Sequence, residues 1–306
     1  MEILQSGSDS TKAAGAGAAI FDLDRTLLAG ASGPIISDAL RQVGLLSTST
    51  SGIESIAFGI FNLIGETWPS MLISRQGARA ARGWPVELVQ EAAEIATSRL
   101  LQSVLPFALQ EIDEHRSVGR KLVMATTTPA DLITPLAAAL GFDDVVATRY
   151  GTNSGCYDGS IDGEFVWGKG KARSIKLWAQ NNHVDLEQSY AYSDSYYDVP
   201  LLSIVGNPRA VNPDPRMYAQ ATLRRWPVMH FDVPPGMPKF AGIEPQRLLL
   251  LLAQPQLFPW VRFGIEGVEN LPSEGPAILV GNHRSYFDPL AIAFLLARAG
   301  RPARFL

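Results

Sequence analysis

The sequence contains a single cysteine, Cys156, among 306 residues. One cysteine excludes an intrachain disulfide and a cysteine-based metal cluster, and it fits a reducing compartment. Charged residues make up only 18% of the chain and the net charge is -4 at pH 7, which argues against a nucleic-acid partner. We therefore expect a cytoplasmic protein that binds no nucleic acid.

The chain also lacks a long hydrophobic run. The most apolar segment, Leu248–Ala253, ends at Gln254 and Pro255, far short of the roughly 20 residues that span a bilayer. It is either a buried helix, which we favour, or a peripheral contact with the inner face of a membrane. Residues 1–15 are small or polar and lack the apolar core of a secretory signal, so we expect a flexible tail.

What the chain does have is alternating strand and helix patterns in its first two thirds. Short apolar runs predict strands at Ala18–Leu23, Lys121–Ala125, Val145–Thr148 and Tyr190–Tyr192, and Val205 with Ala210-Val211 predicts a last strand region. Helices are predicted at Ala130–Leu140, ending at Gly141, and at Lys171–Asn181. This alternation predicts an α/β domain over residues 16–232, with a doubly wound, Rossmann-like parallel sheet.

Two insertions interrupt this pattern. Residues 30–118 look mostly helical, with an amphipathic helix after Pro85, and predict a helical cap inserted after the first strand. The dipeptides Asp158-Gly159 and Asp162-Gly163 are typical of hairpin turns and predict a small β excursion.

The amino-acid composition changes near residue 232. Prolines are frequent over residues 233–262, which predicts a linker. A second α/β pattern then begins over residues 263–306, with a strand at Ala277–Gly281 and a helix at Pro289–Ala299.

Two carboxylates follow the first predicted strand. Asp22 and Asp24 are separated by one residue, so they can address one reaction centre at the carboxyl edge of the sheet, where open α/β sheets bind ligands. An anionic, metal-bound Asp22 can attack phosphorus, while Asp24 exchanges a proton with the leaving oxygen. Taken alone, the pair also fits a solvated turn.

Later strand ends carry further polar residues, namely Thr126, Lys169, Lys171, Asp194 and Asp198. Each has an ordinary interpretation as a strand-end threonine, a solvated lysine or a helix-capping aspartate. Their joint occurrence at the ends of predicted parallel strands favours one functional site.

In this order, the motifs resemble those of the haloacid dehalogenase superfamily, and Thr126-Thr127-Thr128-Pro129 and Trp167-Gly168-Lys169-Gly170-Lys171 resemble its phosphoserine phosphatase-like subfamily IB. The resemblance implies a Mg²⁺ ion held by the Asp22 carboxylate, the Asp24 main-chain carbonyl and Asp194, with Asp198 close by. It also implies that Thr126, Thr127 and Lys171 hold the phosphoryl group. Lys169 is the alternative to Lys171.

One position departs from that subfamily. Phosphoserine phosphatases place an acidic residue nine positions after the nucleophile to hold the substrate ammonium, whereas this chain has Ala31. A buried ammonium without its carboxylate loses about 2 to 5 kcal/mol. We therefore expect weak or no activity on phosphoserine.

A second, shorter resemblance lies near the end of the sequence. Asn282-His283 followed by Asp288 resembles the His-x4-Asp motif of 1-acylglycerol-3-phosphate acyltransferases. It implies that His283 acts as a general base on an acceptor hydroxyl and that Asp288 orients the imidazole. Since fewer than about 50 residues cannot form such a core, we expect a truncated module of a longer protein that uses acyl-CoA and lysophospholipid, without acyl transfer by this chain alone.

The leading hypothesis is a Mg²⁺-dependent hydrolase of small phosphomonoesters that forms an aspartyl-phosphate on Asp22, within a bifunctional phosphatase/acyltransferase of phospholipid biosynthesis. The alternative is a lipid acyltransferase whose N-terminal unit docks or regulates. A phosphotransferase or mutase would use the same aspartyl-phosphate chemistry. The sequence leaves these alternatives open.

Overall fold

The computed structural model describes residues 17–46, 76–233, 264–272, 277–282 and 288–301. The chain divides into two compact units, Met1–Pro235 and Gly236–Leu306, and each is described by itself. The predicted tail at 1–15, nearly all of the predicted linker and the apolar segment Leu248–Ala253 lie outside the described residues.

The first unit is built on a seven-stranded sheet with the order β4-β3-β2-β1-β5-β6-β7. Its strands are β1 (Ala18–Phe21), β2 (Lys121–Pro129), β3 (Asp144–Asn153), β4 (Cys156–Asp162), β5 (Tyr190–Ser193), β6 (Asn207–Val211) and β7 (Val228–Met229). All neighbouring pairs are parallel except the β3–β4 hairpin. The predicted α/β fold with a largely parallel sheet is confirmed.

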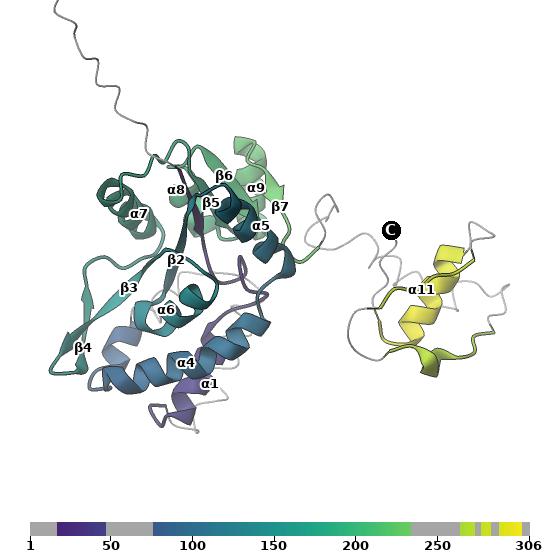
Figure 1. Ribbon diagram of the computed structural model, residues 1–306, viewed down its shortest axis with the longest axis horizontal. Helices are drawn as coiled ribbons and strands as arrows, with labels where there is room; N and C mark the ends of the chain where they lie inside the picture. The colour runs from purple at the N-terminus through teal and green to yellow at the C-terminus, as the bar shows by residue number, and fades with distance from the viewer. Residues whose placement is uncertain (1–16, 47–75, 234–263, 273–276, 283–287, 302–306) are drawn as a thin grey trace, which may run out of the picture. The chain divides into compact units, whose positions relative to one another are not determined.

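Helices lie on both faces of this sheet (Figure 1). Because side chains alternate along a strand, Ala18 and Ile20 of β1 enter one core, while Ala19 and Phe21 enter the other. The first core is shared with α7 (Lys169–Asn181), α8 (Val199–Leu202) and α9 (Pro215–Arg224), and the second with α1 (Gly33–Gln42), α4 (Val86–Gln102), α5 (Pro106–Ser117) and α6 (Ala130–Ala139). The central strand β1 is thus fully buried, as its unbroken apolar run predicts.

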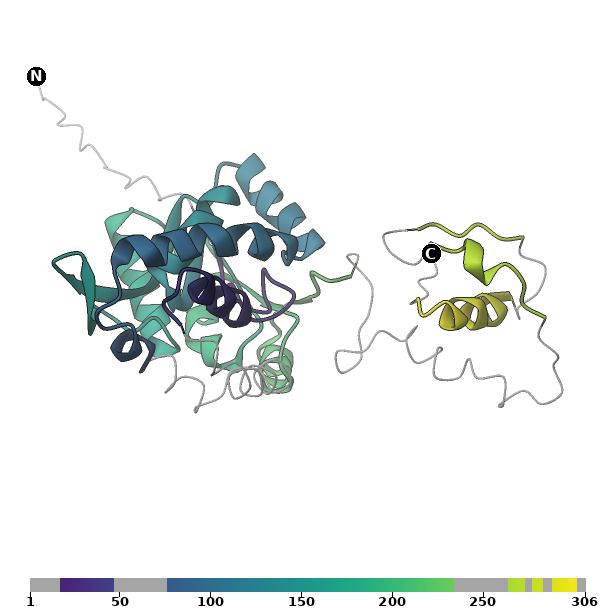
Figure 2. The same ribbon diagram turned by 90° about the horizontal axis from the view of Figure 1, so that it is seen from below.

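The region predicted as a cap, residues 30–118, contains α1, α4 and α5 among its described residues. Helix α1 packs beside α4, and α4 contacts α6, as Figures 1 and 2 show. Helix α5 instead contacts β2 and carries Ile112 and His115 into the interior. We therefore propose that the cap ends before Pro106.

The hairpin turn was predicted at the wrong place. The β3–β4 turn is Ser154-Gly155, where both residues have positive φ (52° and 79°) and Asn153 pairs with Cys156. A two-residue turn of this kind matches the twist of the strands, and glycine adopts its second position without strain. Gly159, by contrast, lies within β4, and Gly163 follows it.

Other predictions fared better in the first unit. Helix α6 ends at Ala139, and Gly141 follows with φ of 72°, as its C-terminal glycine predicts. Strand β7 has only two residues, too few for a periodic signal, and was not predicted.

In the second unit, the predicted strand at Ala277–Gly281 is not formed. No strand pairs with these residues in the described part of that unit, and Ile278 and Val280 are 87% and 92% exposed. A strand requires a neighbour for its main-chain hydrogen bonds, so apolar character alone does not produce one. The predicted helix is present as α11 (Asp288–Arg298), preceded by the short η4 (Val268–Asn270).

Across the described ranges, no helix combines the length and the apolar character that crossing a bilayer requires.

Candidate active site

The carboxyl ends of β1, β2 and β5 bring the predicted site residues to one edge of the sheet. Asp22 directly follows β1, Thr126 lies near the end of β2, and Asp194 directly follows β5. Because β1 pairs with both other strands in parallel, these three ends lie together. The Asp22 amide donates to the Tyr192 carbonyl at 2.9 Å, which continues the β1–β5 pairing into the site.

Lys171 connects two of the carboxylates. Its Nζ donates to Asp22 Oδ1 at 2.8 Å and to Asp198 Oδ2 at 2.7 Å, and all three residues are buried. Such burial of an ammonium requires paired carboxylates. Lys169, the alternative considered from the sequence, is exposed and lines a groove, whereas Lys171 lies beside Asp22.

Asp24 sits in a different environment from Asp22. Its Oδ1 accepts a hydrogen bond from the Ser32 amide at 2.5 Å. Burial raises the pKa of Asp24, against the opposing effects of the Ser32 hydrogen bonds and the Lys171 charge. A raised pKa lets the carboxyl keep its proton at higher pH, which suits a proton donor.

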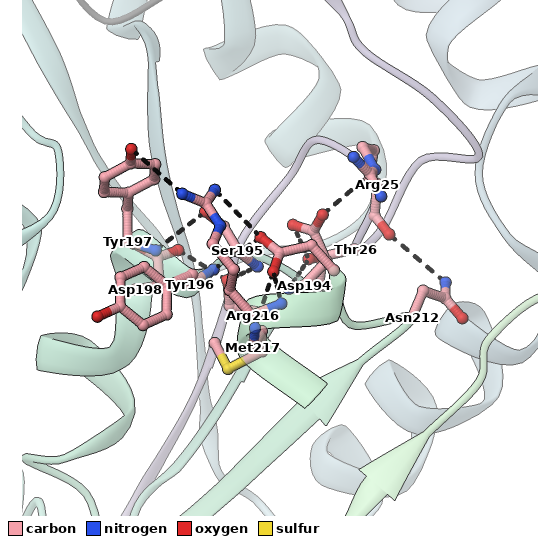
Figure 3. A network of polar contacts seen from close by, with 12 residues as sticks. Arg25, Thr26, Asp194, Ser195, Tyr196, Tyr197, Asp198, Asn212, Arg216 and Met217 are labelled. Atoms are coloured by element: carbon pink, nitrogen blue, oxygen red, sulfur yellow. Dashed lines mark hydrogen bonds and ion pairs between the residues drawn. The ribbon is translucent and has the colours of Figure 1, made fainter. Parts of the chain in front are cut away.

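Asp194 is held by two consecutive residues of the loop after β1 (Figure 3). Thr26 Oγ1 accepts from the Asp194 amide at 3.0 Å and donates to Asp194 Oδ1 at 3.5 Å. Arg25 Nε lies 3.3 Å from Asp194 Oδ2. These contacts join residues far apart in the sequence, and no local pattern indicated them.

Asp214 supports the same loop and was not predicted as a site residue. It is buried, and it accepts hydrogen bonds from the main-chain amides of Tyr196 (3.1 Å), Arg216 and Met217 (both 2.8 Å). It thereby caps α9 and fixes the segment after Asp194. The signal was present in the sequence, because Asp214 precedes Pro215, as expected at a helix N-terminus.

Thr126 is the last buried residue of β2, and the partly buried Thr127 follows it. Thr126 Oγ1 accepts from the Thr128 amide at 3.2 Å. The Thr127 hydroxyl oxygen is buried and has no hydrogen-bond partner among the described residues. A buried hydroxyl of this kind can donate to a ligand oxygen.

A buried polar network lies behind Asp22. Tyr192, whose ring stacks on Phe21, donates from its hydroxyl to Glu111 at 2.6 Å and lies 2.7 Å from His115 Nε2. Arg120, which can only donate, lies 3.1 Å from His115 Nδ1, so Nε2 carries the proton. Burial, with the charges of Arg120 and Arg209, lowers the pKa of His115 to about 4. The imidazole is therefore neutral at pH 7 and ties α5 to β5.

The donor set fits a divalent cation, although the residues described include no group of three or more His, Cys, Asp or Glu side chains suited to one. The predicted set needs only two carboxylates, Asp22 and Asp194, because Asp24 contributes a carbonyl oxygen. Hard oxygen donors of this kind suit Mg²⁺. Asp198 Oδ1 is buried without a hydrogen-bond partner among the described residues. This carboxylate oxygen is therefore available to a cation at this edge of the sheet.

A groove of about 1280 Å³ runs beside these residues. Its walls include Gly168-Lys169-Gly170, directly before Lys171, and Tyr196-Tyr197, between Asp194 and Asp198. The two loops that carry the buried charged residues thus also line this groove.

Of the two residues of the second motif, His283 and Asp288, the structure describes one. His283 lies outside the described residues, whereas Asp288 is the first residue of α11 and is partly exposed. Their predicted pairing therefore stays a prediction.

Comparison with known proteins identifies the family of the first unit. Residues 19–203 match the haloacid dehalogenase-like hydrolase family. The chain belongs to this family. It is 36% identical over 220 residues to the "inhibition of morphological differentiation protein" of Streptomyces azureus. The matched region covers 71% of this chain and 79% of that protein.

Two further relatives extend this comparison. Phosphoserine phosphatase SerB1 of Mycobacterium tuberculosis is 31% identical over 219 residues, 71% of each protein. A Bordetella pertussis protein of unknown function has a similar crystal structure, with a TM-score of 0.61, 27% identity and coverage of 71% of this chain and 99% of that one. This member of the haloacid dehalogenase-like hydrolases is therefore a phosphatase, a phosphoric monoester hydrolase. Residues 262–306 separately match the acyltransferase family.

Proposed function

We propose that this phosphatase hydrolyses small phosphomonoesters through an aspartyl-phosphate on Asp22, with Mg²⁺ as its cofactor. The observation that carries the proposal is the pairing of Asp22 with buried Lys171 at 2.8 Å. Two residues after Asp22, the pKa of the Asp24 carboxyl is raised by burial. One carboxylate is thus held beside a cation while its neighbour is suited to keep a proton. That division of roles is what a nucleophile and a general acid need.

In the first step, an Asp22 carboxylate oxygen attacks phosphorus while the bond from phosphorus to the leaving oxygen breaks. Asp24 gives its proton to that oxygen, and Lys171 offsets the charge on the transferring group. Thr126 and Thr127 are at the end of β2, where their hydroxyl and amide groups can hold phosphoryl oxygens.

In the second step, water attacks phosphorus, Asp24 takes the proton from that water, and the Asp22 carboxylate is released. Mg²⁺ held by Asp22, the Asp24 carbonyl and Asp194, with Asp198 close by, would reduce the repulsion between a carboxylate and a phosphate dianion.

The substrate is proposed to be small and phosphorylated, but not phosphoserine. Ala31 offers no carboxylate for a substrate ammonium. The groove that shares its walls with the catalytic loops exposes Lys169, so we propose that it receives the organic part of the substrate and favours anionic groups there.

A phosphate-release screen with and without Mg²⁺ tests this function. It should include phosphoserine, lysophosphatidic acid and other phosphomonoesters, with an alcohol added as an alternative acceptor. We expect Mg²⁺-dependent phosphate release that is lost in Asp22→Asn and is poor with phosphoserine. Phosphate transfer mainly to the alcohol would instead support a phosphotransferase, and inactivity on every substrate would favour a docking or regulatory role.

The family match of residues 262–306 favours a second function in phospholipid biosynthesis. We propose that His283 and Asp288 belong to an acyltransferase module that uses acyl-CoA and a lysophospholipid, at the cytoplasmic face of a membrane. Incubation of this chain with labelled acyl-CoA and lysophosphatidic acid, beside His283→Ala, tests that assignment. We expect no transfer above the His283→Ala background from this chain alone.

A further inference from the structure

Arg25 is the one residue of the loop after β1 whose side chain pairs with Asp194 as a cation. Its Nε lies 3.3 Å from Asp194 Oδ2, and the two side chains are 22% and 6% exposed (Figure 3). Its terminal Nη1 is buried and has no hydrogen-bond partner among the described residues. The guanidinium is thus directed inward, toward the acidic edge of the sheet.

The backbone fixes this direction. Arg25 has φ of 60°, which is uncommon for a residue with a side chain. Its amide donates to the Gly30 carbonyl at 3.2 Å, and its carbonyl accepts from Asn212 Nδ2 at 3.4 Å. The loop therefore holds the Arg25 backbone on both sides, and only its side chain needs to move for the guanidinium to leave Asp194.

Both oxygens of Asp194 have partners. Oδ1 accepts from Thr26 and Oδ2 faces Arg25. A carboxylate oxygen has more than one lone pair, so a cation can coordinate Asp194 at either oxygen. While Arg25 stays in place, the cation and the guanidinium then lie within a few ångströms of each other in a site that is largely shielded from water. If the guanidinium moves away instead, its ion pair with Asp194 is lost.

We infer that Arg25 competes with Mg²⁺ for Asp194 and so sets the affinity of the metal site. The inference rests on the proposed function, because it takes Asp194 as a ligand of Mg²⁺. Arg25 balances the Asp194 charge when the metal is absent, and it weakens metal binding by repulsion when the metal is present. The direction in which Mg²⁺ affinity changes when Arg25 is removed distinguishes two roles. An arginine that competes with Mg²⁺ weakens metal binding, whereas an arginine that only oriented Asp194 would strengthen it.

The test measures Mg²⁺ affinity without substrate, by isothermal titration calorimetry and by the rise in melting temperature with Mg²⁺. For Arg25→Gln we expect a dissociation constant lower by about tenfold, the size of one nearby unscreened charge. Arg25→Lys keeps the charge and should stay close to wild type. Arg216→Gln is the matched control, because Arg216 lies 3.8 Å from the carboxylate of Asp214, which is not a proposed metal ligand, and it should change the affinity little.

Equal or weaker Mg²⁺ binding by Arg25→Gln, with binding by the wild type intact, would overturn the competition and leave the metal site standing. An equal gain in Arg216→Gln would also overturn it, because general charge would then explain the effect. Absence of Mg²⁺ binding by the wild type would instead overturn the metal site and the inference together. Circular dichroism of each variant establishes that it is folded.

Discussion

Two segments of this chain have the same sequence pattern and different structures. Residues 18–21 and 278–280 are both short apolar runs that precede polar motif residues. The first is a central strand with 0% exposure and parallel neighbours on both sides, whereas Ile278, Leu279 and Val280 are 87%, 43% and 92% exposed. An apolar run therefore becomes a strand only where neighbouring strands take up its hydrogen bonds. The polar residues at the end of β1 depend on those hydrogen bonds for their position.

The largest expected effect concerns Asp22, directly after the paired strand β1. Asp22→Asn removes the proposed nucleophile and keeps its shape, so phosphate release should fall on the order of 10³-fold or more. The measurement is steady-state turnover of the best substrate from the screen, with the thermal melt as the control for folding. Turnover near the wild-type rate would remove Asp22 from the mechanism.

The next effect tests whether the same edge depends on its buried charges. Lys171→Ala leaves Asp22 and Asp198 buried without their ammonium, and breaking such pairs costs about 3 to 5 kcal/mol. Lys169→Ala, two residues away on an exposed position, should change the free energy of unfolding by less than about 0.5 kcal/mol. Urea denaturation of both variants measures this difference. Similar losses in the two variants would contradict the placement of Lys171.

A smaller effect comes from the network behind Asp22. His115 has a pKa of about 4 in the folded protein against 6.5 as an ordinary value, so between these values the unfolded chain binds more protons. The stability that neutral His115 permits is therefore complete above pH 6.5 and is lost as the pH falls toward 4.

This pH dependence can be measured by denaturation at pH 7, 6 and 5. In His115→Asn the slope of stability over this window should be smaller than in the wild type. His183→Asn, which changes an exposed histidine with positive φ, should keep the wild-type slope. Identical slopes in all three proteins would show that His115 titrates normally.

The smallest effect is expected in the exposed segment 278–280. Ile278→Ser with Val280→Ser changes two side chains that are almost fully exposed. Phosphate release should stay at the wild-type level, and stability should change by no more than about 0.5 kcal/mol. A larger loss, measured by the same urea titration, would mean that these side chains are buried against other parts of the protein.

Much of the candidate site was predictable because it depends on local patterns. Apolar runs placed β1, β2 and β5, and the polar residues directly after them, Asp22 and Asp194, followed from chain order. The end of α6 followed from Gly141, since few other residues adopt its positive φ.

What the sequence did not predict depends on contacts between distant segments. The Thr26–Asp194 hydrogen bonds join residues 168 positions apart, and the Arg25–Asp194 pair has a similar separation. The hairpin turn was misplaced because Asp158-Gly159 has the stronger turn signal, while the register of β3 and β4 selects Ser154-Gly155. Ala277–Gly281 has the composition of a strand, yet no neighbour pairs with it in the described residues of its unit.

Under the proposed mechanism, Asp22 becomes phosphorylated during turnover. The most direct measurement is to quench the enzyme with its substrate and Mg²⁺, reduce the acyl-phosphate with borohydride, and locate the reduced residue by mass spectrometry of the peptides. We expect reduction at Asp22, and none in Asp22→Asn. Hydrolysis at the full rate with phosphate trapped on another residue, or with no trapped residue at all, would contradict it.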